Sequence, residues 1–172
     1  MGSIVFKDLN KEYLEWAREL HNDPSVLSML TDNNFVSKEK QLSWFCSLQE
    51  SESSRRLVVF LDGVAVGIVR LDNIDSYNKS MCIGLDIHKD FRGKKLATGV
   101  YVKLLYWCFE IMEYNRVWLM VADFNIVAKN LYTKLGFVYE GRQREALYRE
   151  GAYLDYLLMS ILRKEYYCDT FI

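Results

Sequence analysis

The sequence predicts a mixed α/β protein, of the α+β kind, in which antiparallel strands share one fold with amphipathic helices. Before residue 50, apolar side chains recur at the spacing of helices. The period changes to that of strands at Arg56. Two apolar runs, Leu57–Leu61 and Val64–Val69, then flank Asp62-Gly63, which is a strong hairpin signal. Helical and strand-like stretches alternate after them, and together these observations indicate the mixed class.

The first elements are a strand and three helical stretches. Residues Ile4–Leu9 form a short strand-like run, and a helical pattern begins at Asn10. Asp23 is a favourable N-cap because Pro24 occupies the first helical position after it. Ser37 begins a further helical pattern. These helices precede the sheet.

The second half of the chain is predicted to hold two helices and four strands. The strands are residues 79–88, Arg116–Ala122, Phe137–Tyr148 and Ala152–Leu162, the last two joined by a turn at Glu150-Gly151. The first helix is expected to bury an apolar stripe made of Leu96, Val100, Leu104, Trp107, Cys108 and Ile111. Asn125 caps the second helix, and Gly136 ends it in the left-handed conformation.

Length and composition indicate one globular domain. The chain has 172 residues, 51% of them hydrophobic, which is enough to bury one substantial core. We expect a single domain over residues 1–165 and a C-terminal tail over residues 166–172. The four cysteines lie far apart without a C-x-x-C pair, so we expect reduced thiols and no metal site.

Charge and patterning also limit the partners. A net charge of −1 gives no global attraction to nucleic acid, so a basic site must be local and its anion small. The N-terminus lacks a signal-peptide pattern, and no apolar run has the length of a membrane span. The expected location is the cytoplasm, with no membrane and no nucleic acid among the partners.

One stretch, Phe91–Gly99, predicts an anion cradle. A strand that turns sharply into a helix leaves backbone N–H groups unpaired at the positive end of the helix dipole, where a phosphate is bound favourably. Gly93 allows a close approach of the backbone, and Arg92, Lys94 and Lys95 add cationic charge. The alternative is an ordinary basic turn that caps a helix.

Two motifs carry a resemblance to a known family. The anion cradle matches an R/Q-x-x-G-x-G/A signature at Arg92 and Ala97, and Asn125–Phe137 matches an N-x-x-A-x-x-L-Y-x-K-L-G-F segment. The chain therefore resembles the GNAT superfamily of acetyl-CoA-dependent N-acetyltransferases over roughly residues 4–165. The resemblance implies a mixed, mainly antiparallel central sheet of about six or seven strands, flanked by about four or five helices.

The resemblance also implies acetyl-CoA as co-substrate, without a metal. The residues expected to bind it are Leu85, Ile87, Arg92, Gly93, Lys94, Lys95, Leu96, Ala97, Thr98, Asn125, Lys129 and Tyr132. Lys95 departs from the family signature, which has glycine there, although a residue with helical φ still presents its N–H. Cys82 lies where many relatives carry a glutamate base, so the general base is not assigned.

The implied chemistry is direct attack of an amine on the acetyl thioester. Tyr132 matches the family tyrosine that protonates the leaving thiolate, and a backbone N–H within Ile83–Ile87 is expected to stabilise the oxyanion. The alternative for Tyr132 is a half-buried aromatic whose hydroxyl bonds to backbone. His21 and His88 are not assigned to catalysis.

The acceptor is expected to be a small-molecule primary amine. The segment from Glu140 onward is similar to a branch that contains ribosomal-protein, spermidine and amino-sugar acetyltransferases, and the N-terminal helices look like the pseudaminic-acid pathway type. We therefore expect a nucleotide-linked deoxy-amino sugar, with Trp44 stacking on the base and Arg142 and Arg144 facing the diphosphate. Alternatives are a protein N-terminus, a polyamine, or acetyl-CoA binding without turnover, and a homodimer is one assembly to test.

Overall fold

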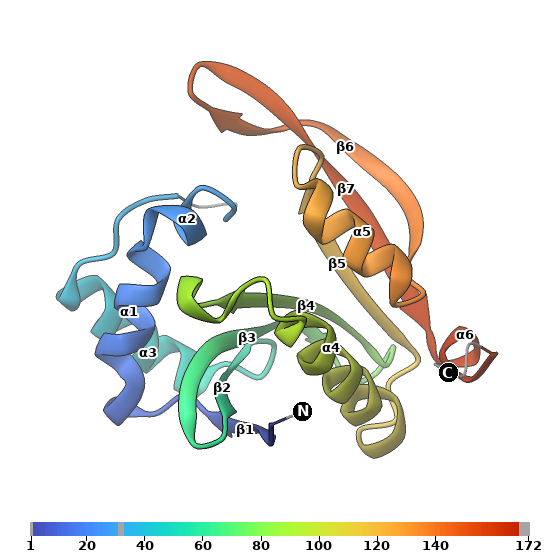
Figure 1. The fold of residues 1–172 in the computed structure, drawn as a ribbon, viewed down its shortest axis with the longest axis horizontal. Coiled ribbons are helices and arrows are strands. Elements are labelled where there is room, and N and C mark those ends of the chain that lie inside the picture. Colours follow the sequence, from blue (N-terminus) through green and yellow to red (C-terminus); the bar gives the residue numbers. More distant parts are fainter. Residues whose placement is uncertain (1, 31–32, 169–172) are drawn as a thin grey trace. The chain divides into compact units, whose positions relative to one another are not determined.

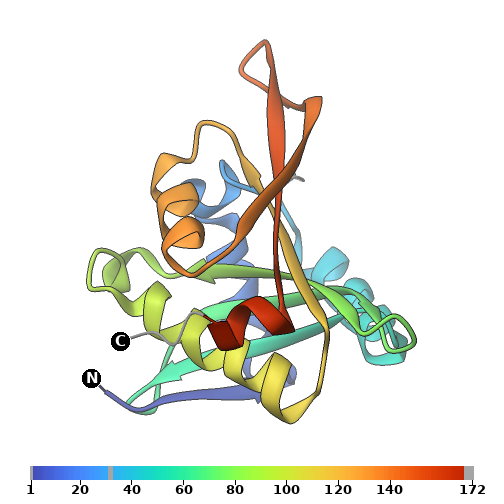
Figure 2. The same cartoon turned by 90° about the vertical axis from the view of Figure 1, so that its right-hand side faces the viewer.

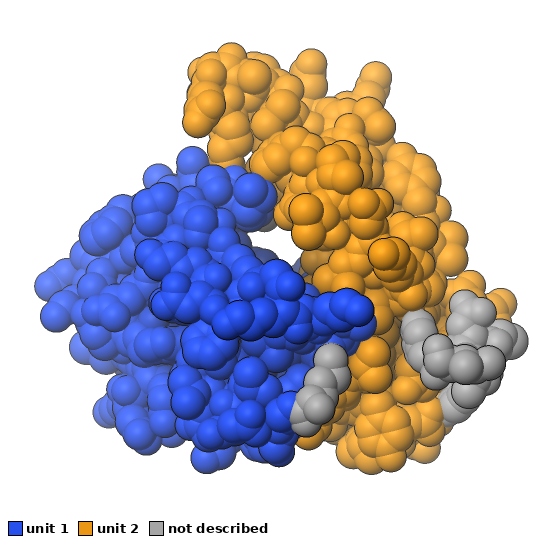
Figure 3. Space-filling model, in the orientation of Figure 1, with its two compact units in different colours: residues 1–74, 83–100 blue, residues 75–82, 101–172 orange. Residues whose placement is uncertain are grey.

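The structure, a computed structural model, describes residues 2–30 and 33–168. The chain divides into two compact units, shown in different colours in Figure 3. Unit 1 comprises residues 1–74 and 83–100, and unit 2 comprises residues 75–82 and 101–172. The prediction of a single domain over residues 1–165 stays a prediction.

Seven strands form one hydrogen-bonded sheet in the order β1-β2-β3-β4-β5-β7-β6. The strands are β1 (Ile4–Asp8), β2 (Arg55–Leu61), β3 (Val64–Asp75), β4 (Ser80–Ile87), β5 (Arg116–Ala122), β6 (Val138–Arg149) and β7 (Ala152–Leu162). The pairs β1–β2, β2–β3, β5–β7 and β6–β7 are antiparallel, whereas β4 and β5 are parallel. The predicted mixed, mainly antiparallel sheet is confirmed.

Six α-helices accompany the sheet in the described part of the chain. They are α1 (Leu14–Asn22), α2 (Pro24–Leu27), α3 (Lys38–Glu50), α4 (Leu96–Tyr106), α5 (Ile126–Lys134) and α6 (Arg163–Cys168), with 3-10 turns η1 (Lys11–Tyr13) and η2 (Lys89–Phe91). The helix number exceeds the expected four or five because α2 and α6 are short, with four and six residues. Helix α6 also continues past residue 165, where the predicted tail begins.

The predicted helix starts of unit 1 are confirmed by side-chain caps. Asn10 Oδ1 accepts a hydrogen bond from the Glu12 backbone N–H at 2.9 Å. Asp23 Oδ1 accepts from the Ser25 N–H at 2.9 Å, and Pro24 opens α2 as expected. Ser37 caps α3 in the same way. Each cap satisfies a donor that the first helical turn leaves without an intrahelical partner.

The two predicted hairpins are also confirmed. Asp62 and Gly63 have φ values of 50° and 85°, and Glu150 and Gly151 have 48° and 86°. Positive φ at both central residues is the geometry of the two-residue turn that matches the twist of antiparallel strands. Strand β3 runs on to Asp75, beyond the predicted end at Val69.

The core of unit 1 lies between its helices and one face of its strands. Helices α1 and α3 bury Ala17, Leu20 and Phe45 against Val58 and Ile68 of β2 and β3. Figure 1 shows α1 and α3 beside these strands, with α2 at one end of α1. This packing places the start of α2 in the same unit as the anion cradle.

Unit 2 is built on strand β5 and the hairpin β6–β7. Figure 1 shows α5 running beside β5 and β7, and Figure 2 shows β6 and β7 as a long two-stranded ribbon. Ala122, Leu147 and Tyr156 form its buried cluster on the strands. At the other end of the ribbon, Arg116 of β5 makes an ion pair with Glu140 of β6.

The predicted stripe of the helix after the anion cradle is partly wrong. Val100, Leu104 and Cys108 are buried, but Ile111 is 59% exposed. The cause is a π-helical turn over Trp107–Ile111, in which the Met112 N–H donates to the Trp107 carbonyl at 3.0 Å. A π turn contains more residues than an α turn, so the buried face shifts away from the extrapolated positions.

Candidate active site

The segment named the anion cradle, Phe91–Gly99, lies between β4 and α4, and its binding of an anion stays a prediction. Gly93 and Lys95 both have positive φ, 75° and 58°. The Lys95 carbonyl accepts from the Gly99 N–H at 3.3 Å, and α4 begins at Leu96. By helix geometry, the N–H groups of the first turn lack intrahelical acceptors, so they are available to an anion.

Lys95 occupies the glycine position of the family signature in a conformation that glycine favours. The expectation of an ordinary helical φ at this residue is therefore wrong, because the φ of 58° lies in the left-handed region. An L-residue there costs roughly 1–2 kcal/mol, because its Cβ approaches a carbonyl oxygen. Lys95 therefore holds a left-handed backbone at this energetic cost.

Arg92 fixes the cradle to two neighbouring segments of unit 1. Its Nε donates to the Ile87 carbonyl at 2.9 Å, and its Nη1 donates to Ser25 Oγ at 2.9 Å. Lys94 Nζ donates to the Asp90 carbonyl at 3.1 Å. Both cations thus support the loop itself, in addition to any ligand that they bind.

Asp23 links the N-terminus of α2 to the start of the cradle. Ser25 donates both its hydroxyl and its backbone N–H to the Asp23 carboxylate, and Lys89 Nζ lies 3.4 Å from Asp23 Oδ2. The hydrogen bond from the Ser25 hydroxyl, followed by the one from the Ser25 N–H, lowers the pKa of Asp23 to about 2. Burial acts in the opposite direction and is the smaller effect. Ionised Asp23 therefore supports the serine that receives Arg92.

The lowered pKa of Asp23 predicts an acid-sensitive contribution to stability. A carboxylate with a depressed folded-state pKa stabilises the protein above its unfolded pKa, near 3.8, and loses this effect as the pH falls towards 2. Asp23→Asn should therefore flatten the fall in unfolding free energy between pH 4 and pH 2, measured by denaturant titration at several pH values. Glu50→Gln at the end of α3 is the control, and an equal flattening in it would contradict the assignment.

The conformation of Lys95 predicts a stabilising substitution. Lys95→Gly should raise the unfolding free energy by about 0.5–1 kcal/mol, because relief of the left-handed strain exceeds the added entropy of the unfolded chain. Lys94→Gly, one residue away and without positive φ, should lower it by about 0.4–1 kcal/mol. Chemical denaturation of the two variants measures the difference. A loss of stability in Lys95→Gly would show that its φ is not strained.

Tyr132 lies on α5 in unit 2, and its hydroxyl is held by another tyrosine. The Tyr132 and Tyr101 hydroxyl oxygens are 3.1 Å apart, and the two rings meet edge to face with centroids 5.4 Å apart. Tyr101 is 1% exposed, so this partner is fixed by the core. Tyr132 also packs on Phe137, at 5.8 Å between ring centroids. The hydroxyl thus has an oriented side-chain partner that sequence reasoning did not identify.

Asn125 and Lys129 shape the start of α5. The Ala128 N–H donates to Asn125 Oδ1 at 3.1 Å, which confirms the predicted cap. Lys129 Nζ donates to the carbonyl and a carboxylate oxygen of Asp123, at 2.6 and 2.8 Å. This ion pair lowers the pKa of Asp123. The ammonium of Lys129 is therefore engaged with the loop that precedes the helix.

A test of Tyr132 follows from its oriented hydroxyl. Tyr132→Phe should lower kcat by roughly 10²-fold, the lower range for loss of a general acid, with little change in acetyl-CoA affinity. Steady-state kinetics and a separate binding titration measure the two effects. Tyr77→Phe is the control, since Tyr77 is 94% exposed. Unchanged kcat in Tyr132→Phe at every pH would remove Tyr132 from the mechanism.

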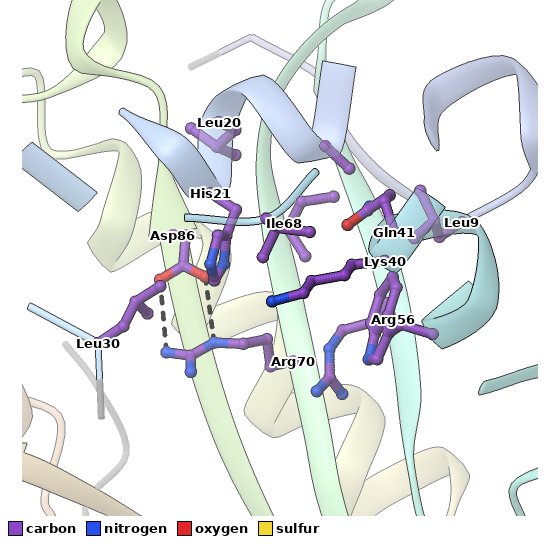
Figure 4. A pocket seen from close by; sticks show the side chains of 13 residues that line it. Leu9, Leu20, His21, Leu30, Lys40, Gln41, Arg56, Ile68, Arg70 and Asp86 are labelled. Carbon is purple, nitrogen blue, oxygen red and sulfur yellow. Dashed lines mark hydrogen bonds and ion pairs between the residues drawn. The ribbon is translucent and has the colours of Figure 1, made fainter. Parts of the chain in front are cut away.

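A pocket of about 380 Å³ lies within unit 1 between the helices α1 and α3 and the strands β2 to β4 (Figure 4). Its lining residues are Leu9, Ala17, Leu20, His21, Leu30, Val36, Lys40, Gln41, Trp44, Arg56, Ile68, Arg70 and Asp86. The volume falls within the range of small-molecule sites. Trp44, which the sequence analysis assigned to acceptor binding, is among these residues.

Arg70 and Asp86 form an ion pair on the strand side of this pocket. Arg70 Nε lies 3.1 Å from Asp86 Oδ2, and Nη2 donates to Oδ1 at 3.4 Å. The guanidinium lies over Gly84, where an added Cβ would come within 2.8 Å of Nη2. Gly84 is therefore required for the guanidinium to lie across the strand at this position.

Sequence reasoning missed most polar residues of the pocket. Arg70 and Asp86 each interrupt an apolar strand run, and that interruption is the signal that could have identified them. His21 was excluded from catalysis, yet it lines the pocket, with Nε2 3.4 Å from the Asn34 carbonyl. Lys40 was not assigned to a site. Nothing local in the sequence places these four residues together.

The two arginines predicted for a sugar diphosphate lie on β6 of unit 2. Arg142 Nη1 donates to Asp155 Oδ2 at 2.8 Å, and Nη2 lies 3.6 Å from Asp123 Oδ2. Arg144 is exposed, within the irregular register between Gln143 and Leu147. Because Arg142 is paired with two carboxylates, the structure gives no support to its role as a diphosphate ligand.

The cysteines and acidic groups add little to the site. Cys82 lies on β4 opposite Trp118 of β5, and the general base stays unassigned. Burial raises the pKa of Cys108 to about 12, so this thiol stays protonated.

Among the described residues, no cluster of three or more His, Cys, Asp or Glu side chains is arranged to hold a metal ion. No helix in the described ranges is long and apolar enough to cross a membrane.

The sequence pattern of the acetyltransferase (GNAT) family matches residues 11–137, which include the anion cradle and α5. The chain belongs to this family. Enzymes of the family use acetyl-CoA, so the protein is an acetyl-CoA-dependent N-acetyltransferase. The predicted superfamily and its fold are thereby confirmed.

Individual relatives of this GNAT enzyme carry two kinds of name. The putative ribosomal N-acetyltransferase YdaF of Bacillus subtilis is 35% identical over 105 residues, which are 61% of this chain and 57% of the relative. The spermidine N(1)-acetyltransferase of Escherichia coli K12 is 25% identical over 97% of this chain and 90% of its own. The spermidine N-acetyltransferase of Vibrio cholerae, solved with CoA and spermine, matches with a TM-score of 0.90 and 25% identity, over 95% of this chain and 98% of its own.

Proposed function

We propose that this GNAT enzyme transfers the acetyl group of acetyl-CoA directly to a primary amine of a small molecule, and that a polyamine is the favoured acceptor. The supporting observation is the length of the match to the spermidine N(1)-acetyltransferase of Escherichia coli, which covers 97% of this chain. The fold similarity to the Vibrio cholerae enzyme supports the same acceptor class. Polyamine acetylation was an alternative in the sequence analysis.

For acetyl-CoA, the proposed phosphate site is the anion cradle. Its support is the pair of positive φ values at Gly93 and Lys95, together with the N–H groups that the start of α4 presents. Arg92 would hold the loop in this shape through Ile87 and Ser25. The remaining proposed contacts of unit 1 are Leu85, Ile87, Lys94, Leu96, Ala97 and Thr98.

In unit 2, Asn125, Lys129 and Tyr132 are the proposed acetyl-CoA contacts, and Tyr132 the general acid. An amine must be neutral to attack the thioester, although a free alkylammonium loses its proton only near pH 10. The leaving thiolate accepts a proton from an oriented hydroxyl, and the contact of Tyr132 with Tyr101 supplies that orientation. The base that deprotonates the amine is unassigned.

The amino-sugar acceptor loses its main support. The relatives described above are named for spermidine and for ribosomal substrates, and Arg142 is paired with Asp155 and Asp123. A protein N-terminus remains the second candidate, because YdaF has the higher identity, 35%, over the part that it matches. These findings favour the alternatives of the sequence analysis over its first choice.

An acetyl-CoA turnover screen tests the proposal. Purified enzyme should release free CoA thiol fastest with spermidine or spermine, more slowly with peptides that carry a free N-terminus, and at background with amino-sugar nucleotides. Mass spectrometry of the product identifies the acetylated amine, and Tyr132→Phe serves as the low-activity control. Efficient turnover of peptides alone would replace the polyamine by a protein N-terminus. Binding of acetyl-CoA without turnover of any amine would support a non-catalytic module.

Self-association is a further part of this proposal. A Vibrio cholerae spermidine N-acetyltransferase is described as dodecameric, and its chain matches this one with a TM-score of 0.83. The expected homodimer is thus one of several assemblies that light scattering of the purified chain would distinguish.

A further inference from the structure

The unit 1 pocket carries an excess of positive charge. Of the described residues that line it, Lys40, Arg56 and Arg70 are basic, whereas Asp86 is the one carboxylate. The lining comes from helices α1 and α3 and from strands β2, β3 and β4, so it is assembled by the fold rather than by one segment. This charge distribution is not explained by acetyl transfer to a polyamine.

Local carboxylates neutralise two of the three cations. Asp86 forms an ion pair with Arg70, in which Arg70 Nε lies 3.1 Å from Asp86 Oδ2. Arg56 donates to Asp72 Oδ1 at 2.8 Å, and its side chain is only 14% exposed. In the described part of the chain, the ammonium of Lys40 has no carboxylate within ion-pair distance. Among the described residues, Lys40, which is exposed, is therefore the lining cation that lacks a carboxylate partner.

Figure 4 shows the position of that charge. The Lys40 side chain extends into the space between His21, Arg56 and Arg70, with its ammonium towards the strand side of the pocket. Lys40, Arg56 and Arg70 line the same pocket, so an anion placed there would be attracted to the ammonium and could accept from the guanidinium groups. Such an anion would meet donors from two kinds of cation, which favours carboxylate and phosphate oxygens.

Apart from His21 and Gln41, the rest of the described lining is apolar. Its residues are Leu9, Ala17, Leu20, Leu30, Val36 and Ile68, with Trp44 37% exposed beside Arg56. A lining that combines apolar side chains with basic ones matches a ligand that has an apolar body and one oxyanion. A polyamine is a cation, like the basic side chains of the lining, and it lacks a compact apolar body, so it does not suit this pocket.

We propose that the unit 1 pocket binds a small amphipathic oxyanion, in which a compact apolar body ends in a carboxylate or a phosphate. Lys40 supplies an attracting charge, and Arg56 and Arg70 orient the oxyanion. The apolar body lies against Ile68, Leu20 and Leu30. This inference concerns binding and holds for either acceptor class, polyamine or protein N-terminus.

Calorimetric titration of the full chain with benzoate and with phenyl phosphate tests the proposal. Both probes carry an apolar ring and one oxyanion, and benzyl alcohol is the uncharged comparison. At least one anionic probe should bind, and benzyl alcohol should bind roughly tenfold or more weakly, because a hydrogen bond to a charged group contributes about 1.5–3 kcal/mol. Saturable binding of benzyl alcohol with equal affinity would overturn the oxyanion requirement, and so would failure of both anions to bind.

Matched lysine variants of α3 locate the binding. Lys40→Gln should weaken binding of the anionic probe roughly tenfold, whereas Lys38→Gln should leave it unchanged, since Lys38 lies outside the lining and pairs with Glu15. Melting temperatures of both variants verify the fold, and Lys40→Glu should abolish binding. Equal affinity in the wild-type protein and Lys40→Gln would overturn the proposal.

Two further titrations separate this site from the catalytic proposal. Acetyl-CoA should bind Lys40→Gln as tightly as it binds the wild-type protein, and a matching loss would show that the pocket belongs to the acetyl-CoA site instead. Spermidine should not displace the anionic probe. If spermidine displaces the anionic probe, and does so more strongly in Lys40→Gln than in the wild-type protein, the pocket binds a polyamine and the inference is overturned. A negative amine turnover screen would leave the predicted anion binding intact.

Discussion

Arg92 provides the interaction on which the geometry of the candidate phosphate site depends. Its guanidinium joins the carbonyl at the end of β4 to the serine at the start of α2, so one side chain positions the loop against two elements of unit 1. Ser25 is in turn held by the Asp23 carboxylate. These contacts support a backbone with two left-handed residues, Gly93 and Lys95, on either side of Lys94.

The sequence predicted those features that short segments determine. Asp23 and Asn125 are read as caps because the acceptor and its donor lie two or three residues apart. The hairpin at Asp62-Gly63 is equally local. The cradle was likewise predicted from the residues of one short stretch, Phe91–Gly99, whereas the role of Tyr132 came from the family resemblance. In contrast, the left-handed φ of Lys95 has no local signal, because the surrounding fold selects it against the preference of the residue.

The parts of the site that the sequence did not predict are contacts between distant segments. Tyr101 meets Tyr132 across 31 positions of the chain, and nothing in the period of α4 distinguishes it from a core residue. The lining of the unit 1 pocket spans Leu9 to Asp86. Arg142 was interpreted as a free cation because its partner Asp155 lies 13 residues away on the facing strand. Charge assigned from sequence alone overlooks such pairing.

The π turn after α4 has a consequence for comparing this chain with others. In this last turn of the helix the Met112 N–H donates to the carbonyl five residues before it, so the turn holds one residue more than an α turn. A relative in which this helix is uninterrupted would therefore be one residue shorter between Trp107 and Met112. An alignment without a gap there would place the residues that follow the turn out of register by one position. Pairwise identities counted through this helix would then understate the structural relationship.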